Sequence, residues 1–149
     1  MFGLSNEVLD SFVEVNKKIY ELLKKDAEQA GLTVVQLATL HNLSSRPNIH
    51  LGDLASQLRM TNSTMSGVID RLVHSGLVER AIPPENRRSV SINLTEKGKD
   101  LIAQITSKGS IFVKKVNSVM DLPEEELQQL LRLHKLVLSK LALEEEETL

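Results

Sequence analysis

The chain has 149 residues, of which 41% are hydrophobic and 26% charged, the composition of an ordinary soluble globular protein. It contains no cysteine, which excludes disulfides, thiolate metal sites and cysteine-based redox switches or nucleophiles. The net charge is −2, but residues 121–149 hold eight acids against three bases and residues 1–120 hold twelve acids against fifteen bases, so a mildly basic face is permitted outside the C-terminal region.

Apolar residues at helical spacing predict four helices in the first half of the chain, over residues 5–29, 33–43, 52–58 and 62–74. Gly31 and Gly76 are expected to end the first and the last of these helices, because glycine readily adopts the backbone conformation that follows helix ends. Thr33 and Gln36 have the spacing of a capping box, and Thr61 is the predicted N-cap of the fourth helix.

Two strands and a tight loop follow. Residues 77–82 (LVERAI) and 89–94 (SVSINL) are strand-like, and the second run alternates apolar with polar residues. The six residues between them, PPENRR, are predicted to be a hairpin loop, because two consecutive prolines cannot donate hydrogen bonds to a strand ladder. The loop carries Arg87 and Arg88.

The last third of the chain predicts two more helices. Thr95 is expected to cap a long helix over 95–120, and Asp121 with Glu124 to form a capping box that starts a helix over 122–143. We expect the acidic tail LEEEETL to fray. The predicted fold class is therefore mainly α with a small β-hairpin wing.

The helix over 62–74 places apolar residues on one stripe and short polar residues at its N-terminal turn. Asn62, Ser63, Thr64 and Ser66 are small hydrogen-bonding residues, which let a helix approach base edges in a major groove. The backbone N–H groups of the same turn attract phosphate. A solvated helix face is the alternative interpretation.

The arginine-bearing loop favours the DNA interpretation. An arginine at a hairpin tip can enter a narrow minor groove, where the negative potential is deepest. Arg87 and Arg88 are joined to the polar helix by one short strand, so the two features lie close together in the sequence. Taken alone, the arginine pair also fits a solvated loop.

Three segments form a joint pattern: LTVVQ (32–36), LGDLASQLRMTNSTMSGVIDRLVHSGLVER (51–80) and ENRRSVSINLTEKGKDLI (85–102). The order DRLxxxGLVER, then RR, then a strand ending in LTEKG resembles the MarR (multiple antibiotic resistance regulator) family of winged helix-turn-helix transcription factors. The resemblance covers about residues 30–102 by motif and the whole chain by element order. The joint pattern is specific, whereas no single piece of it would suffice.

The resemblance implies a winged helix-turn-helix lobe plus a long-helix dimerisation region. The expected domains are an N-terminal dimerisation helix (1–30), a DNA-binding lobe (31–100), and C-terminal dimerisation helices with the acidic tail (101–149). A homodimer is implied, and the long amphipathic helices need apolar partners unless they pack within the monomer. The implied function is sequence-specific repression at a pseudo-palindromic operator in double-stranded DNA.

The family's DNA contacts carry over to residues of the polar helix and the wing: Thr61, Asn62, Ser63, Thr64, Ser66, Gly67, Arg71, Arg87 and Arg88. Arg71 is expected to contact phosphate. Two positions depart from the family pattern. Asn86 stands where an aspartate is usual and cannot form an ion pair, so we expect Arg88 to be held more loosely. Gly67 stands where a basic or larger residue is frequent.

Relatives in this family bind small organic ligands between the dimer helices and the winged lobe. The resemblance therefore implies a small-molecule effector, with pocket walls at Phe12, Ile19, Leu37, Leu40, His41 and Ile105. Plain core packing is the alternative role for each of these residues.

The sequence gives little support for a metal site or a catalytic site. No two of the histidines lie within one helical turn, so we expect no metal site and no cofactor; they are His41, His50, His74 and His134. The motifs GxSxG, GxGxxG and the P-loop are absent, so we expect no enzyme.

The sequence also bears on location and on one remaining alternative. The first residues, MFGLSNEVLDSF, lack the segments of a secretory signal, and no apolar run approaches the roughly 18 residues of a membrane span. We therefore expect a cytoplasmic protein without a membrane segment. The net charge of −2 leaves open a winged-helix dimer that contacts proteins without specific DNA binding.

Overall fold

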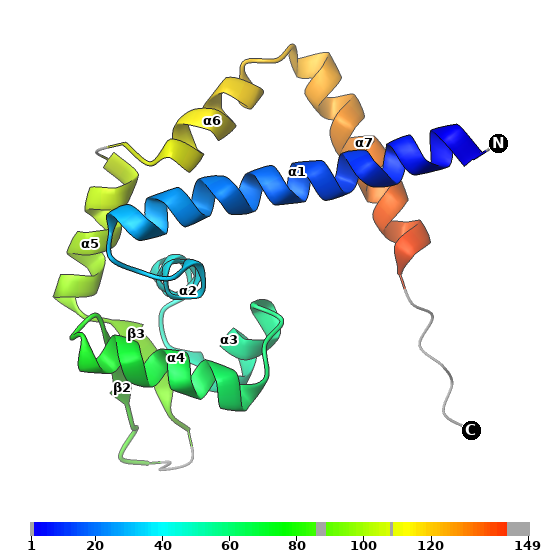
Figure 1. The fold of residues 1–149 in the computed structure, drawn as a ribbon. Helices are drawn as coiled ribbons and strands as arrows, with labels where there is room; N and C mark the ends of the chain where they lie inside the picture. Colours follow the sequence, from blue (N-terminus) through cyan, green and yellow to red (C-terminus); the bar gives the residue numbers. More distant parts are fainter. Residues whose placement is uncertain (1, 86–88, 108, 143–149) are drawn as a thin grey trace, which may run out of the picture. The chain divides into compact units, whose positions relative to one another are not determined.

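The structure is a computed structural model that describes residues 2–85, 89–107 and 109–142. The chain divides into two units, Met1–Val113 and Lys114–Leu149. The elements in chain order (Figure 1) are α1 (Phe2–Gln29), α2 (Val34–Ser45), β1 (Ile49–His50), α3 (Leu51–Gln57), α4 (Asn62–His74), β2 (Val78–Ala81), β3 (Ser91–Leu94), α5 (Glu96–Ser107), α6 (Ile111–Met120) and α7 (Glu124–Leu141).

The predicted helix boundaries at Thr33, Gly31 and Gly76 are confirmed. The Oγ1 of Thr33 accepts a hydrogen bond of 3.2 Å from the N–H of Gln36, and the Gln36 side chain accepts one of 2.9 Å from the N–H of Thr33. Gly31 and Gly76 have φ of 69° and 74°, a region that glycine occupies at little cost. Local chemistry therefore sets where these helices begin and end.

The hydrophobic core of the first unit gathers around α2. Each fully buried leucine or isoleucine there contributes about 1.5–3 kcal/mol relative to an exposed one. The buried apolar residues are Ala27, Leu37, Leu40, Leu43, Ile49, Leu54, Ala55, Met65, Ile69, Leu72, Leu77, Val78, Ile92, Leu94 and Ile102. They come from α1 to α5, from the three strands, and from the residue before β2, so one core holds the helices and the sheet together.

The sheet has three antiparallel strands in the order β1-β3-β2, rather than the hairpin alone. Strand β2 pairs with β3 through Val78↔Leu94 and Arg80↔Ile92. Strand β1 has only two residues, and so short a strand has no periodicity from which it could be predicted. It is positioned by Asn48, whose N–H donates to Oδ1 of Asn93 at 2.7 Å.

Two predictions for the C-terminal helices are wrong. The predicted continuous helix over 95–120 is broken into α5 and α6, because Ser110 and Asp26 supply hydrogen-bond acceptors for a new helix start. The predicted capping box at Asp121 and Glu124 is also absent. The last helix begins at Glu124 after Pro123, with no side-chain cap hydrogen bond.

The long terminal helices carry exposed apolar side chains. On α1, these are Val8, Leu9, Val13, Val15, Ile19 and Tyr20. On α7, which lies in the second unit, they are Leu130, Leu131, Leu133, Leu136, Leu138 and Leu141. None of the side chains described on α7 is fully buried.

Candidate nucleic-acid interface

Helix α4 begins at a side-chain cap. Thr61 has an extended backbone (φ −70°, ψ 153°), and its Oγ1 accepts a hydrogen bond of 3.1 Å from the N–H of Thr64. The Thr61 hydroxyl also donates to Oγ1 of Thr64 at 2.9 Å. The predicted N-cap is therefore confirmed, and Thr61 and Thr64 hold each other's side chains in place.

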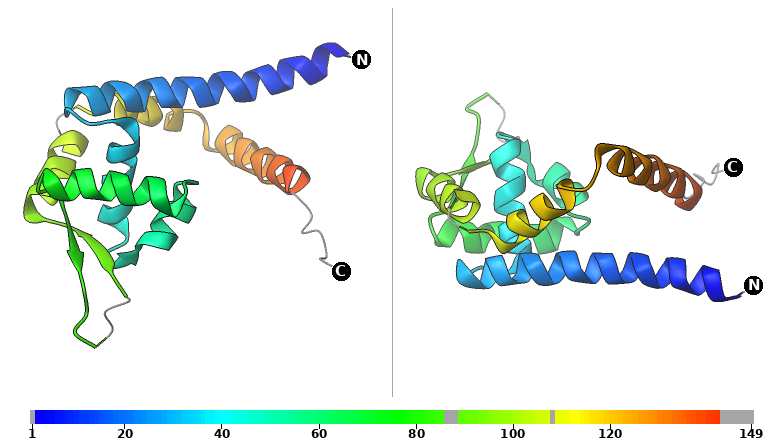
Figure 2. Two further views of the ribbon diagram at one scale, coloured as in Figure 1. Left: turned by 60° about the horizontal axis from the view of Figure 1, so that its bottom comes forward. Right: turned by 90° about the horizontal axis from the view of Figure 1, so that it is seen from above.

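The two faces of α4 separate as the periodicity predicts. Met65, Ile69 and Leu72 are buried, and their spacing places them on one side of the helix. Ser66 is partly buried beside this stripe. The remaining predicted DNA-binding residues of this segment are exposed: Thr61, Asn62, Ser63, Thr64, Gly67 and Arg71. Their spacing and exposure therefore place them together on the accessible side of α4 and its N-cap. Figure 2 shows α4 from two further directions.

Two glycines lie on or near this face, Gly67 and Gly52. A Cβ atom added at Gly67 would meet no other atom within 4 Å. A Cβ atom added at Gly52, in the first turn of α3, would lie 4.0 Å from Oδ1 of Asn62. The Asn62 side chain thus lies near the start of α3, so the N-terminal ends of both helices contribute to one surface.

An ion pair joins α4 to the wing strands. The guanidinium of Arg80 on β2 donates to the carboxylate of Asp70 on α4. The side chains are 34% and 62% exposed, so solvent screens part of their attraction. The predicted wing contacts Arg87 and Arg88, and the departing residue Asn86, lie outside the described residues.

The connection from β3 to α5 is bonded to the end of α4. The Thr95 hydroxyl donates to the carbonyl oxygen of Gly76 at 2.6 Å and accepts from the N–H of Gly98 at 3.1 Å. The Lys97 ammonium donates to the carbonyl oxygen of Ser75 at 2.8 Å. Thr95 is predicted from the sequence only as a helix cap. Its bond to the end of α4 joins segments that are 19 residues apart and cannot be read from residue spacing.

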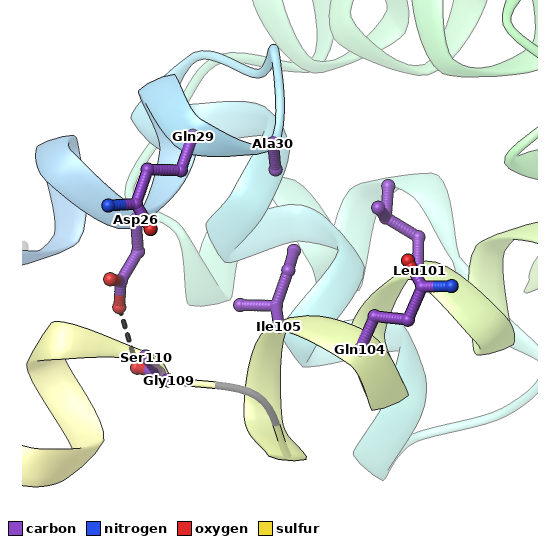
Figure 3. Close-up of a pocket in the computed structure, with 8 residues that line it drawn as sticks. All are labelled: Asp26, Gln29, Ala30, Leu101, Gln104, Ile105, Gly109 and Ser110. Carbon is purple, nitrogen blue, oxygen red and sulfur yellow. Dashed lines mark hydrogen bonds between the residues drawn. The ribbon is translucent and has the colours of Figure 1, made fainter.

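The predicted ligand-pocket residues lie in different surroundings. Leu37 and Leu40 belong to the buried core, Phe12 and His41 are half-buried, and Ile19 is exposed on α1. Ile105 is the one member of the set that lines a pocket of about 250 Å³ at the ends of α1 and α5 (Figure 3). The other lining residues are Asp26, Gln29, Ala30, Leu101, Gln104, Gly109 and Ser110.

A buried carboxylate at the edge of this pocket caps α6. Asp26 is 3% exposed and accepts a hydrogen bond of 2.6 Å from the Ser110 hydroxyl (Figure 3). It also accepts from the Ile111 N–H at 2.8 Å and the Phe112 N–H at 3.2 Å. Burial lowers the pKa of nearby His41, and the charge of Asp26 opposes that shift in part. Asp26 could not be identified from the sequence, because its hydrogen-bond partners lie more than 80 residues away.

In residues 2–85, 89–107 and 109–142, no group of three or more histidines, aspartates or glutamates could hold a metal ion. Within the same ranges, no helix has the length and apolar character needed to cross a membrane.

Comparison with known proteins identifies relatives of the lobe. Residues 32–90 match the MarR family profile. The uncharacterized HTH-type transcriptional regulator YfiV of Bacillus subtilis (strain 168) is 30% identical over 120 residues, covering 73% of this chain and 74% of YfiV. The crystal structure of AbsC, a MarR family transcriptional regulator from Streptomyces coelicolor, matches with a TM-score of 0.80 at 26% identity, over 95% of this chain and 96% of AbsC. A mutant of S. aureus MepR bound to an oligodeoxyribonucleotide matches with a TM-score of 0.59 at 26% identity, over 91% of this chain and 98% of that chain.

Proposed function

Since this chain belongs to the MarR family of transcriptional regulators, we propose that it is a cytoplasmic, dimeric repressor that binds a pseudo-palindromic operator in double-stranded DNA. It is a regulator and not an enzyme. The observation that carries the proposal is the exposed polar surface at the start of α4, on a lobe similar to that of the DNA-bound MepR mutant.

In this proposal, α4 enters a major groove. Asn62, Ser63 and Thr64 face the base edges, and their short side chains allow the helix backbone to come close. Arg71, about two helical turns after Thr64, contacts a phosphate. The wing tip at 83–88 enters the flanking minor groove, where arginine is attracted by the negative potential.

The dimer places two lobes on one duplex. Its support is the set of exposed apolar side chains on α1 and on α7, which lose contact with water when a second copy covers them. Two-fold symmetry then requires inverted half-sites, with centres about one helical turn, or roughly 34 Å, apart. The dimerisation helices set this separation.

A small organic ligand is the proposed effector, and the pocket of about 250 Å³ lined by Ile105 is the candidate place for it, because Ile105 belongs to the predicted pocket walls. By thermodynamic linkage, a ligand that releases DNA must bind more tightly to the DNA-free protein. DNA must weaken ligand binding by the same factor.

Selection of bound fragments from genomic DNA with the purified protein tests the function and identifies the operator. Affinity for the recovered fragments should fall steeply with added salt, because phosphate contacts release counterions. Recovery of no enriched sequence, with weak binding that is insensitive to salt, would favour a dimer that contacts proteins instead.

Substitutions at the start of α4 test the assignment of base contacts. Ser63→Ala and Thr64→Ala should change sequence preference, by about 1–3 kcal/mol for each lost base contact. A uniform loss over all sequences would assign these residues to the phosphates. Arg88→Ala should weaken binding most at operators with A·T-rich flanks, where the minor groove is narrow.

A further inference from the structure

The turn between α3 and α4 contains an arginine in a conformation that favours glycine. Arg59 has φ of 53° and follows Leu58, the C-cap of α3. Its N–H donates to the carbonyl oxygen of Ser56 at 3.1 Å, and the N–H of Met60 donates to that of Ala55 at 2.8 Å. These two bonds form a Schellman motif, whose left-handed position is usually occupied by glycine.

The same motif ends two other helices of this chain, and both use glycine. At the end of α1, Gly31 holds the left-handed position with φ of 69°, and at the end of α4, Gly76 holds it with φ of 74°. The accompanying hydrogen bonds run from Gly31 to Glu28, from Leu32 to Ala27, from Gly76 to Val73 and from Leu77 to Leu72. Of these three residues, only Arg59 adopts the geometry with a side chain that strains it.

A strained residue in a motif that glycine satisfies calls for a reason in its side chain. Arg59 is exposed, and within the described part of the chain it forms no ion pair. It therefore contributes neither burial nor a salt bridge that would offset the strain.

The position of Arg59 gives that reason. It lies two residues before Thr61, the N-cap of α4, so its Cα is within about 8 Å of the Thr61 Cα. Thr61, Asn62 and Ser63 beside it are all exposed. Three consecutive backbone hydrogen bonds, from the N–H groups of Leu58, Arg59 and Met60, fix the main chain at Arg59. They hold its Cα beside the surface that faces DNA in the proposed function.

We propose that Arg59 is a DNA-backbone contact that clamps a phosphate at the edge of the groove entered by α4. The inference rests on the proposed DNA-binding function and adds a residue to its surface. Arginine suits this role because its fork of donors matches a phosphate and its charge persists at any physiological pH. Such a contact supplies affinity and orientation but reads no base.

The test uses Arg59→Gly, because strain and DNA contact then change in opposite directions. Removing the strain should raise the melting temperature of the full-length protein by about 2–4 °C. Removing the charge should lower affinity for a fluorescent duplex, recovered by selection with the wild-type protein, by at least about threefold at about 50 mM salt. The slope of log affinity against log salt should become shallower by roughly one for each lobe, with unchanged ranking of operator variants.

Two further variants separate a contact from general charge. Arg59→Lys should keep most of the salt slope, because it retains the positive charge. Lys25→Gln removes one exposed charge from α1 and should leave both the affinity and the slope near wild type. The proposal is overturned if Arg59→Gly binds as tightly as wild type, or if Lys25→Gln lowers the slope as much as Arg59→Gly does. If the wild-type protein selects no duplex, the proposed function fails and this contact fails with it.

Discussion

A Cβ atom added at Gly98 would lie 2.1 Å from the carbonyl oxygen of Leu77, far inside any real contact distance. Gly98 is in the first turn of α5, and Leu77 directly precedes β2. The same Leu77 oxygen accepts a hydrogen bond of 3.1 Å from the N–H of Thr95. Backbone therefore packs directly against backbone here, and only glycine allows it.

Gly98→Ala should lower the free energy of unfolding by about 1–3 kcal/mol, because the crowded neighbour is main chain and cannot rotate away. Urea denaturation followed by circular dichroism measures the change. A variant with wild-type stability would mean that α5 shifts away from Leu77 at no cost.

Gly67→Ala is the matched control within α4, and it carries a prediction of its own. An added Cβ meets nothing within 4 Å, so the variant should be more stable by about 1 kcal/mol, the helix propensity difference between the two residues. If Gly67 faces DNA closely, operator affinity should fall although stability rises. Unchanged affinity would remove Gly67 from the interface.

The ion pair between Arg80 and Asp70 should matter more for DNA binding than for stability. Because both side chains are substantially exposed, Asp70→Asn should cost only about 0.2–1 kcal/mol of stability. We expect a larger loss in operator affinity, since the pair ties the wing strand to α4. The charge-exchanged double variant Asp70→Arg with Arg80→Asp should recover part of that affinity, and no recovery would argue against a positioning role.

Asp26→Asn should destabilise the start of α6, because the charged acceptor of three hydrogen bonds becomes a neutral one. The expected cost is about 1–3 kcal/mol. Hydrogen exchange should accelerate at the amides of Ile111 and Phe112, whereas the amide of Gln36, in the Thr33 capping box, should be unaffected. Equal acceleration at both places would indicate global unfolding instead.

The half-buried imidazole of His41 should make stability depend on pH. Burial lowers its pKa in the folded protein below the ordinary value, so the unfolded chain binds the proton more readily. This contribution is fully present above the unfolded pKa of about 6.5, and it is lost as pH falls through the folded pKa. His41→Gln should flatten that part of the stability profile, as measured by denaturation at a series of pH values. An identical profile would assign the pH dependence to other groups.

Much of the lobe could be predicted because its signals are local. Thr33 and Thr61 indicate helix starts within three residues, and Gly31 and Gly76 indicate helix ends. The alternation of Ser89–Leu94 likewise indicated β3, although the strand itself is shorter. These features depend on residues that are neighbours in the sequence.

The features that could not be predicted from the sequence depend on contacts between distant segments of the chain. Asp26 lies near the end of its own helix and caps another helix that begins more than 80 residues later. Periodicity carries no sign of this contact, and it therefore predicts one helix over 95–120 where the structure has two. Gly109 and Ser110 at that break are the kind of residues that interrupt helices, and they were the available local signal. The predicted capping box at Asp121 does not form, because Pro123 is the N-cap residue of the last helix.

The junction at Thr95 has a mechanical consequence. Thr95 and Lys97 donate hydrogen bonds to the carbonyl oxygens of the two residues that directly follow α4, and Gly98 packs on Leu77. Helix α4 and the first turn of α5 therefore form one rigid unit. Helix α4 has 13 residues, so its far end lies about 20 Å from this junction. A rotation of about 10° at α5 would move that end by about 3.5 Å, close to the roughly 3.4 Å that separates successive bases along a strand. A small rotation of α5 is therefore enough to move the far end of α4 by about one base pair along the duplex.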